Sequence, residues 1–464
     1  MSDLNIWMNG EFVGTWAVSK SGLNSLVYAQ SWMESRRGRA LSLSLPFTPA
    51  NKLEGEVVAN YFDNLLPDAE GIRKRIQSRY RIKGAAPFDL LKAIGRDCVG
   101  AVQLLPAGVV PDDSHKIEVE PLSEQDIEEY LKGLGGPAVA GAHEDEDFRI
   151  SIAGAQEKTA LTLFDEQWCR PHGATPTTHI LKPQIGVTPT KLDLSHSVEN
   201  EWLCNRIMAE LGFNVAGSDI ETFGSQRVLV VTRFDRTWLS TPDGSRWIAR
   251  RPQEDLCQAR GINSAMKYEY RGGPGIRECL DVLKSSANYP PDGLTFLRAQ
   301  LLFWFLAATD GHAKNFSLHI QPGGRYLMTP IYDVLSAWPI LDATALPSKH
   351  TTQQYKKVKM AMSVRSDGGK KNYKLAEMQY RHWKSEAERS GIPHAWDEML
   401  KMVDEIEPAL KRAEQSLPTG FPESVSEPIF KGTRMHLERF LKSEIGSPLA
   451  MRLQSSRSTP QPSL

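Results

Sequence analysis

Two acidic residues and an amide, each placed at the end of an apolar run, most constrain what this chain can fold into. Asp310 follows the apolar run 301–308 and stands five positions before Asn315. Asp333 closes a second, shorter apolar stretch. Polar groups that follow buried elements lie on short loops held by a rigid scaffold, where they can meet around a ligand. The pattern therefore predicts a polar site built on a buried framework.

The order and spacing of these three groups are typical of phosphoryl transfer by protein kinases. In that chemistry an Asp orients the acceptor hydroxyl, while an Asn after four intervening residues and a later Asp hold Mg²⁺ on the ATP phosphates. Asp310 is the candidate catalytic residue, and Asn315 and Asp333 are the candidate metal ligands. For Asp310 or Asn315 alone, a loop cap or an Asx turn is the alternative.

A phosphate-binding loop is expected upstream. Residues 149–163 have the pattern of a strand, a small-residue turn and a second strand, and Ala153, Gly154 and Ala155 let the backbone approach an anion closely. The backbone amides from Ala153 to Gln156 are expected to hold the γ-phosphate. The segment is not a Walker A loop, because it lacks the final Gly-Lys-Ser/Thr and no helix follows. An ordinary turn between strands is the alternative.

The remaining parts of a kinase nucleotide site follow in the required order. Lys182 ends a short β-like run and is expected to pair with the ATP phosphates. Segment 197–211 opens with a Ser suited to an N-cap, and its apolar residues recur at helical spacing. Glu201 in this helix is the expected partner of Lys182, with Glu199 as the alternative. Each residue alone has an ordinary explanation, such as a solvated strand end or a charge favoured near a helix N-terminus.

With these motifs in place, the sequence resembles the HipA family of bacterial serine/threonine kinase toxins. The resemblance runs from about residue 5 to about residue 440. Its most specific strings are residues 153–158 (Ala-Gly-Ala-Gln-Glu-Lys) and 309–316 (Thr-Asp-Gly-His-Ala-Lys-Asn-Phe). The other matching stretches are residues 95–100, 175–180, 233–236, 252–255 and 272–275, and the likeness is weaker at both ends of the chain. The resemblance implies a kinase that uses ATP and Mg²⁺.

The resemblance also implies nucleotide contacts for further residues. The backbone of Arg233 and Phe234 is expected to meet the adenine; a core Phe and a surface salt-bridge Arg are the alternative. Lys158, His312 and Lys314 lie within the two specific strings and are expected near the nucleotide. For His312, a role in packing the loop is favoured over a role as a base.

Ser151 begins the expected phosphate loop, and the resemblance implies that it is an autophosphorylation site that switches the enzyme off. Nearly two negative charges at the seat of the ATP phosphates would repel the nucleotide or eject the loop. An unmodified Ser that bonds its own turn is the alternative. Residues 253–255 form a polar cluster that either orients a loop near the substrate or starts a solvated helix.

The substrate and partners are expected only through the resemblance. The implied acceptor is a Ser of an aminoacyl-tRNA synthetase, the glutamyl enzyme. The implied partner is a HipB-like dimeric helix-turn-helix antitoxin on operator DNA, with the chain as co-repressor. A basic stretch would contact DNA phosphates there, recruit substrate, or form a solvated surface: Lys356, Lys357, Lys359, Arg365, Lys370, Lys371, Lys374 and Arg381. A catalytically silent co-repressor and a small-molecule kinase are the alternative functions.

Composition excludes several classes of protein. The net charge of −1 argues against a chain that coats nucleic acid by itself. Five cysteines without a Cys-x-x-Cys pair indicate neither a disulfide framework nor a zinc site. No apolar run reaches the roughly 18 residues of a membrane span, and the first residues lack the features of a signal peptide. A cytoplasmic location without a membrane partner is therefore expected.

The expected fold class is α+β, with a two-lobed protein-kinase-like body, a small N-terminal α/β (barrel-like) subdomain and an all-α C-terminal lobe. Strands are predicted within residues 4–50, including 41–45, and helices over 61–80, 87–94 and 123–134. The expected divisions are an N-terminal subdomain (1–106), a connector with an acidic loop (107–147), an ATP-binding N-lobe (148–236), a helical C-lobe (237–445) and a disordered tail (446–464).

Overall fold

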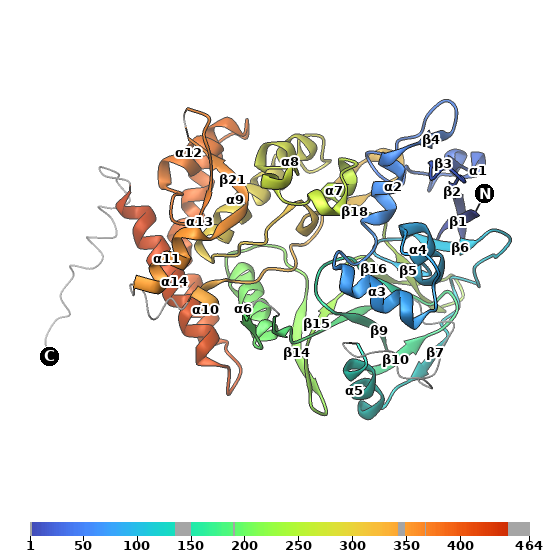
Figure 1. The fold of residues 1–464 in the computed structure, drawn as a ribbon, viewed down its shortest axis with the longest axis horizontal. Helices are drawn as coiled ribbons and strands as arrows, with labels where there is room; N and C mark the ends of the chain where they lie inside the picture. The colour runs from blue at the N-terminus through green and yellow to red at the C-terminus, as the bar shows by residue number, and fades with distance from the viewer. Residues whose placement is uncertain (1, 135–149, 189–190, 342–348, 367, 444–464) are drawn as a thin grey trace, which may run out of the picture.

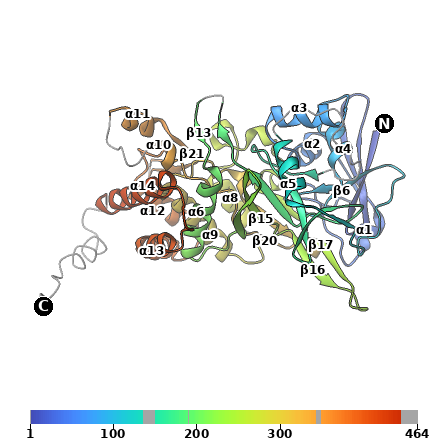
Figure 2. The same cartoon turned by 90° about the horizontal axis from the view of Figure 1, so that it is seen from below.

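The computed structural model describes residues 2–134, 150–188, 191–341, 349–366 and 368–443. Within these ranges the protein has a mixed α/β fold, with a small N-terminal sheet and a group of C-terminal helices at opposite ends of the molecule (Figure 1). A six-stranded sheet lies between them, as the view from below also shows (Figure 2). The expected acidic loop up to residue 147 and the expected tail lie outside the described residues.

The N-terminal subdomain is an open antiparallel sheet, not the barrel-like structure expected. Its strands have the order β4-β3-β2-β1-β6, and the two outer strands do not pair with each other. Helices α1, α2 and α4 pack against the sheet, α3 packs against α4, and Trp16 of the sheet stacks on Phe62 with ring centroids 3.8 Å apart. The elements are β1 (Ser2–Met8), β2 (Glu11–Val18), β3 (Asn24–Tyr28), β4 (Lys52–Glu54), β6 (Gln103–Pro106), α1 (Gln30–Glu34), α2 (Glu56–Asp63), α3 (Glu70–Arg79) and α4 (Pro87–Ile94).

Two local predictions for this subdomain were wrong. The helix expected over 61–80 is interrupted, because α2 ends at Asp63 and α3 begins only at Glu70. The interruption contains Pro67, which disfavours helix at the preceding residue, and the next amide, Asp68 N–H, donates to Gly154 O at 2.9 Å. Residues 41–45 alternate like a strand but form none; Leu41 and Leu45 are buried.

The six-stranded sheet is antiparallel throughout, in the order β14-β15-β11-β9-β10-β7. Its outer strand β7 comes from the segment predicted to be a connector. Helix α5 (Glu124–Lys132), capped by Ser123, packs on one face, and α6 (Ser197–Glu210) packs on the other. The strands are β7 (Val119–Pro121), β9 (Thr159–Phe164), β10 (Gln167–Pro171), β11 (His179–Pro183), β14 (Ser218–Phe223) and β15 (Gln226–Thr232).

Strand alternation decides which side chains reach α6. On β11, Leu181 belongs to the cluster under α5, whereas its neighbour Ile180 packs in the cluster on the α6 face. Because strand side chains alternate between faces, Lys182 lies on the α6 side with Ile180. The sheet thus presents Lys182 to the helix that carries Glu201.

The C-terminal lobe is mainly helical, but the prediction of an all-α lobe was wrong. It contains a three-stranded sheet and a two-stranded hairpin that lie next to the catalytic loop: β18 (Gln253–Asp255), β19 (Ser317–Ile320), β20 (Tyr326–Met328), β21 (Lys359–Arg365) and β22 (Lys371–Lys374). The helices are α7 (Leu256–Ala259), α8 (Ile276–Leu283), α9 (Pro291–Phe305), α10 (Trp338–Leu341), α11 (Lys349–Lys357), α12 (Tyr380–Arg389), α13 (Ala395–Gln415) and α14 (Glu423–Lys442).

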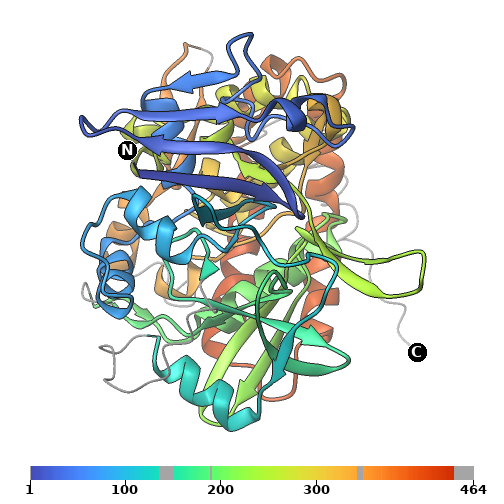
Figure 3. The same cartoon turned by 90° about the vertical axis from the view of Figure 1, so that its right-hand side faces the viewer.

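Several short pairings complete the fold. A hairpin of β16 (Arg236–Ser240) and β17 (Arg246–Arg250) extends away from the body (Figure 3). Strand β5 (Asp97–Cys98) of the N-terminal subdomain pairs in parallel with β8 (Ile150–Ser151). A small hairpin, β12 (Gly186–Val187) with β13 (Asp193–Leu194), precedes α6. No helix in the described part of the chain is long and apolar enough to cross a membrane.

Helix α14 approaches the core most closely at Gly432. A Cβ added there would lie closer to the indole ring of Trp338 than van der Waals contact allows, and Trp338 is fully buried. Gly432→Ala is therefore expected to lower the free energy of unfolding by about 1–3 kcal/mol, measured by urea denaturation. The control is Gly71→Ala in α3, where the added Cβ would meet only the Arg75 side chain at 3.8 Å. Equal stabilities of the two variants would contradict this account of the packing.

Candidate active site

The catalytic loop leaves the buried helix α9 and brings Asp310 to the surface. Its side chain is 55% exposed, whereas Asn315 is buried beneath it. The Nδ2 group of Asn315 donates to the main-chain oxygens of Asp310 at 2.9 Å and Asp333 at 3.5 Å. Asn315 therefore joins the two loops that carry the acidic residues. Its Oδ1 accepts no hydrogen bond from the residues that the structure describes.

Lys182 lies between two carboxylates. Its Nζ is 2.7 Å from Glu201 Oε1 and 2.9 Å from Asp333 Oδ1. Although burial disfavours the charged ammonium, Asp333 and Glu201 together raise the pKa of Lys182. Burial also opposes ionisation of Asp333, but Lys182 and Lys158 hold the pKa of that carboxyl well below its usual range. The cluster therefore carries fixed charges of both signs at neutral pH.

The alternative partner, Glu199, is engaged elsewhere. It accepts a hydrogen bond from Arg227 Nε of β15, and it lies 3.7 Å from His196. Side chains two positions apart on a helix point in different directions, so only one of the two glutamates can face Lys182. In the structure that residue is Glu201.

Asp333 has a backbone conformation that non-glycine residues seldom adopt. Its φ is 62°, in the left-handed region, which costs an L-residue about 1–2 kcal/mol. Such outliers concentrate at functional sites, where the surrounding contacts hold them. Here the Asp333 main-chain oxygen lies near Asn315 Nδ2 and its side chain contacts Lys182.

The expected phosphate loop is docked on the N-terminal subdomain. Gly154 has φ 115°, and its carbonyl accepts the Asp68 amide. Lys158 folds back so that its Nζ donates to Ala153 O at 3.0 Å. Burial lowers the pKa of Lys158 to about 8, although Asp333 opposes the shift. The positive φ favours glycine at this position, and a side chain there would require Lys158 Nζ to move.

The other two residues of the expected phosphate loop are Ala155 and Gln156. Gln156 donates from Nε2 to Pro183 O at 2.9 Å, which ties the loop to the end of β11. Ala155 is exposed. The backbone amides of Ala155 and Gln156 donate to no group in the part of the chain that the structure describes. They are therefore available to an anion.

Ser151 is buried in this conformation. Its Oγ donates to Leu65 O at 2.7 Å, and the residue is 0% exposed. It belongs to β8, which pairs with β5. The alternative expected for an unmodified Ser, a bond within its own turn, is thus replaced by a bond to the N-terminal subdomain. A phosphoryl group can reach this hydroxyl only after the loop has moved away from the N-terminal subdomain.

The two residues expected to contact the adenine through their backbone differ in whether that backbone is already hydrogen-bonded. The Arg233 N–H donates to Thr178 O at 2.9 Å and its carbonyl accepts the Arg236 amide at 3.3 Å, so its backbone is already engaged. The Phe234 backbone makes no hydrogen bond among the described residues. The Phe234 ring packs 5.6 Å from Tyr332, beside the cluster on the Lys182 face of the sheet. Phe234 fits an adenine contact, and Arg233 does not.

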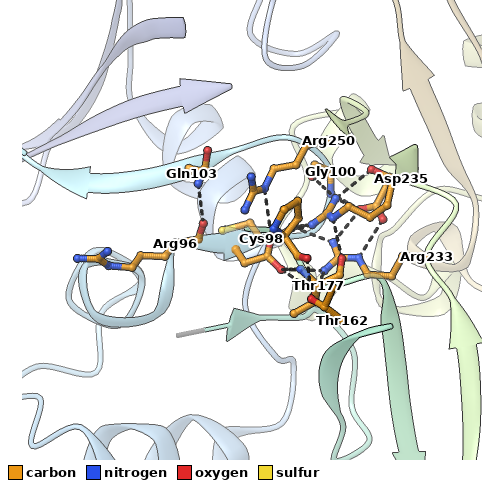
Figure 4. A network of polar contacts seen from close by, with 12 residues as sticks. Arg96, Cys98, Gly100, Gln103, Thr162, Thr177, Arg233, Asp235 and Arg250 are labelled. Atoms are coloured by element: carbon orange, nitrogen blue, oxygen red, sulfur yellow. Dashed lines mark hydrogen bonds and ion pairs between the residues drawn. The ribbon is translucent and has the colours of Figure 1, made fainter. Parts of the chain in front are cut away.

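Arg233 instead belongs to a buried ion-pair network that also refutes the surface salt bridge considered for it (Figure 4). Its guanidinium contacts Asp235 at 2.8 Å and Asp97 at 3.3 Å. Arg236 and Arg250 also reach Asp97, at 2.9 and 3.2 Å. Three guanidinium groups thus surround two carboxylates where β5 of the N-terminal subdomain meets the segment after β15. No local sequence pattern predicts this network, because Asp97 lies 136 or more positions from its three arginine partners.

Lys314 is not placed as a nucleotide contact. Its Nζ donates to Asn64 O at 3.1 Å, Asn64 Oδ1 at 2.8 Å and Asp255 Oδ2 at 2.8 Å. An ammonium has three donors, and all three are used here. Residues 253–255 form the buried strand β18, and Asp255 is also the N-cap of α7, so the solvated helix start considered for this cluster is wrong. Lys314 therefore fastens the catalytic loop to the N-terminal subdomain.

His312 packs under the catalytic loop. It is 3% exposed, and neither ring nitrogen has a hydrogen-bond partner among the described residues. Burial lowers its pKa. The neutral, enclosed ring fits the packing role favoured for this residue over a role as a base.

Three members of the basic stretch are paired with carboxylates. Lys371 contacts Glu269 at 2.8 Å, Lys374 contacts Glu377 at 2.7 Å, and Arg365 lies 4.0 Å from Glu278. The hairpin of β21 and β22 that carries these residues is tied to the catalytic loop, because Ala361 N–H donates to Thr309 O at 3.0 Å. Part of the positive charge is thus neutralised beside the candidate site.

Glu254 joins the N-terminal subdomain to the C-lobe and is expected to make stability depend on pH. It accepts the Leu43 amide at 2.9 Å and the Ser42 hydroxyl, and burial raises its pKa to about 8. The unfolded carboxyl ionises near pH 4.3, so the folded state binds more protons between these values and loses stability as pH rises from about 4 to 8. Glu254→Gln should flatten this dependence, measured by urea denaturation at several pH values. A parallel dependence in both proteins would contradict it.

The donor set suits Mg²⁺. Asn315 Oδ1 and the Asp333 carboxylate supply two oxygen ligands on adjoining loops. Mg²⁺ is commonly held by one or two carboxylates together with substrate phosphates. The protein residues thus fit a metal bound jointly with a nucleotide.

Comparison with known proteins identifies the family. Residues 150–413 match the model of the HipA-like C-terminal domain, and residues 4–105 match that of the HipA N-terminal domain. The chain is 32% identical over 422 residues to the putative kinase Y4mE of Sinorhizobium fredii, covering 88% of this chain and 91% of that protein. It is 30% identical over 325 residues to the serine/threonine-protein kinase toxin HipA of Shewanella oneidensis, covering 67% and 69%.

A solved structure of HipA from Shewanella oneidensis, in a complex with HipB and operator DNA, has the same fold. The two chains superimpose with a TM-score of 0.73 at 22% identity, covering 95% of this chain and 97% of that one. The kinase-like fold expected from the motifs is thereby confirmed. By its two domains, its relatives and its fold, this chain belongs to the HipA family of serine/threonine kinase toxins.

Proposed function

We propose that the chain is an ATP- and Mg²⁺-dependent serine/threonine protein kinase. The observation that carries this proposal is the convergence of the Lys182–Glu201 ion pair on Asp333, next to the loop of Asp310 and Asn315. Protein kinases need these same groups together before transfer can occur. Two of the named relatives are kinases or putative kinases by name.

Each residue has a distinct role in this proposal. Asp310 orients the acceptor hydroxyl, and Lys182, held by Glu201, neutralises the nucleotide phosphates. Asn315 and Asp333 hold the metal, which supplies positive charge to the phosphate oxygens when it is bound. The free amides of Ala155 and Gln156 bind the γ-phosphate, and Phe234 lies at the adenine.

The substrate and partners are proposed at the level of the family. The acceptor is a Ser of a translation factor, the glutamyl-tRNA synthetase, and the partner is a HipB-like antitoxin dimer on operator DNA, with which the chain represses transcription in the cytoplasm. Support comes from the relative named a HipA toxin kinase and from the similar chain solved with HipB and DNA. Autophosphorylation of Ser151 would switch the kinase off by preventing the loop from returning to its buried seat.

The first test is incubation of the purified protein with Mg-ATP, followed by intact mass and a peptide map. A gain of one phosphate on Ser151 that is absent in Asp310→Asn is the expected result. Added glutamyl-tRNA synthetase should gain phosphate on a Ser. Binding of ATP without transfer to either protein would instead favour a catalytically silent co-repressor.

A further inference from the structure

Tyr268 lies against the candidate catalytic residue, and none of the roles proposed above uses it. Its hydroxyl donates to Asp310 Oδ1 at 2.5 Å. The second carboxylate oxygen, Oδ2, is 3.7 Å from His312 Nε2, which is beyond hydrogen-bond distance. Among the described residues, the Tyr268 phenol is therefore the one side-chain hydrogen-bond partner of the Asp310 carboxylate.

The aromatic ring of Tyr268 packs against two other rings. It meets the His312 ring edge-on with centroids 5.1 Å apart, and it stacks on Tyr270 at 5.2 Å. His312 is itself buried within the catalytic loop. The ring is thus held by the same loop whose carboxylate its hydroxyl binds.

The neighbours of Tyr268 in the chain are anchored to two separate parts of the site. On one side, Lys267 contacts Asp68 at 2.8 Å, and the Asp68 amide holds the phosphate loop. On the other side, buried Glu269 accepts the Ser363 amide at 2.6 Å and contacts Lys371 at 2.8 Å. These bonds leave Tyr268 little freedom to move away from Asp310.

When one oxygen of the half-exposed Asp310 carboxylate is held by a hydrogen bond, the position of its second oxygen is defined as well. Without a partner, the Asp310 side chain could rotate, and each rotation would move the acceptor hydroxyl out of line with the phosphate. Holding reacting groups in one geometry accounts for a large part of the rate of such reactions. A hydrogen bond from a hydroxyl to a carboxylate is also among the stronger ones in proteins.

We propose that Tyr268 is a positioning residue: its hydroxyl fixes Asp310 Oδ1 so that Oδ2 receives the hydroxyl of the acceptor. The proposal rests on the proposed kinase function. In this role Tyr268 acts through Asp310.

The test compares Tyr268→Phe with Tyr270→Phe in the full-length protein. Phe keeps the packed ring and removes only the hydroxyl, and Tyr270 is a neighbouring tyrosine, 44% exposed. The readout is ADP formation from Mg-ATP, which counts transfer to protein and to water alike, together with Tm and the Kd for ATP. Tyr268→Phe is expected to lower kcat by about 10- to 100-fold with the KM for ATP within about twofold. Tyr270→Phe should match the parent throughout.

Each other outcome has a separate meaning. A kcat for Tyr268→Phe within about twofold of the parent overturns the proposal, as does a lowered Tm or a weakened affinity for ATP that accounts for the loss. If Tyr268→Phe does not fold, Glu269→Gln loosens the same anchor, and an unchanged kcat there would also refute it. A parent protein that neither binds ATP nor forms ADP would overturn the kinase function itself.

Discussion

Replacing Asp310 by Asn should lower the rate of phosphoryl transfer by about 10²- to 10³-fold or more, because the amide cannot take the proton of the acceptor hydroxyl or orient it in the same way. The side chain is 55% exposed and an amide oxygen can still accept the Tyr268 hydroxyl, so the free energy of unfolding should change by no more than about 1 kcal/mol. ADP formation and phosphate incorporation measure the first effect, and urea denaturation the second.

The control for this variant is Asp281→Asn. Asp281 lies on α8 of the same lobe, with a side chain that is 59% exposed, and none of the proposed roles uses it. Its rate should equal that of the parent protein. A catalytic rate for Asp310→Asn close to that of the control would rule Asp310 out as the catalytic residue, even if the protein is a kinase.

Replacing Asp97 by Asn should lower the free energy of unfolding by about 3–5 kcal/mol at neutral pH. The change leaves the guanidinium groups of Arg233, Arg236 and Arg250 buried with a single remaining carboxylate, Asp235. Uncompensated buried charge is among the few causes of such large losses. Urea denaturation at pH 7 measures the effect, and Asp113→Asn, which changes an exposed aspartate beside His115, is the control.

The same network predicts a dependence on pH. Burial opposes ionisation of Asp97, but Arg236, Arg233 and Arg250 together hold its pKa well below the usual range. A carboxyl with a depressed folded pKa stabilises the protein above its unfolded pKa of about 3.9, and this contribution disappears as pH falls below that value. The difference in stability between the parent and Asp97→Asn should therefore shrink below about pH 4. A constant difference down to pH 3 would show that the carboxylate charge is not the cause.

Local sequence signals predicted some elements well. The helix over 123–134 was predicted from its Ser cap, and the structure has that cap on α5. The helix over 87–94 begins with a Pro, which suits the first helical turn, and α4 has the same bounds. These elements were predictable because their starts depend on residues within one helical turn.

The failed predictions concern segments whose structure depends on distant contacts. The helix expected over 61–80 is interrupted where Asp68 binds the phosphate loop, 86 positions further along the chain at Gly154. Residues 41–45 have the alternation of a strand, but Glu254 takes the Leu43 amide that a neighbouring strand would otherwise bind. Neither contact can be predicted from the pattern of neighbouring residues in the sequence.

The candidate site divides in the same way. The sequence by itself determined the order of Lys182, Glu201, Asp310, Asn315 and Asp333, because each group follows a strand, a helix start or an apolar run that is visible locally. Only the tertiary structure decided that Lys314 joins the catalytic loop to the N-terminal subdomain, that Arg233 belongs to a buried ion-pair network, and that Tyr268 donates a hydrogen bond to Asp310. These roles depend on which charged and hydroxyl groups become neighbours after burial, and residues more than forty positions apart become neighbours only through packing.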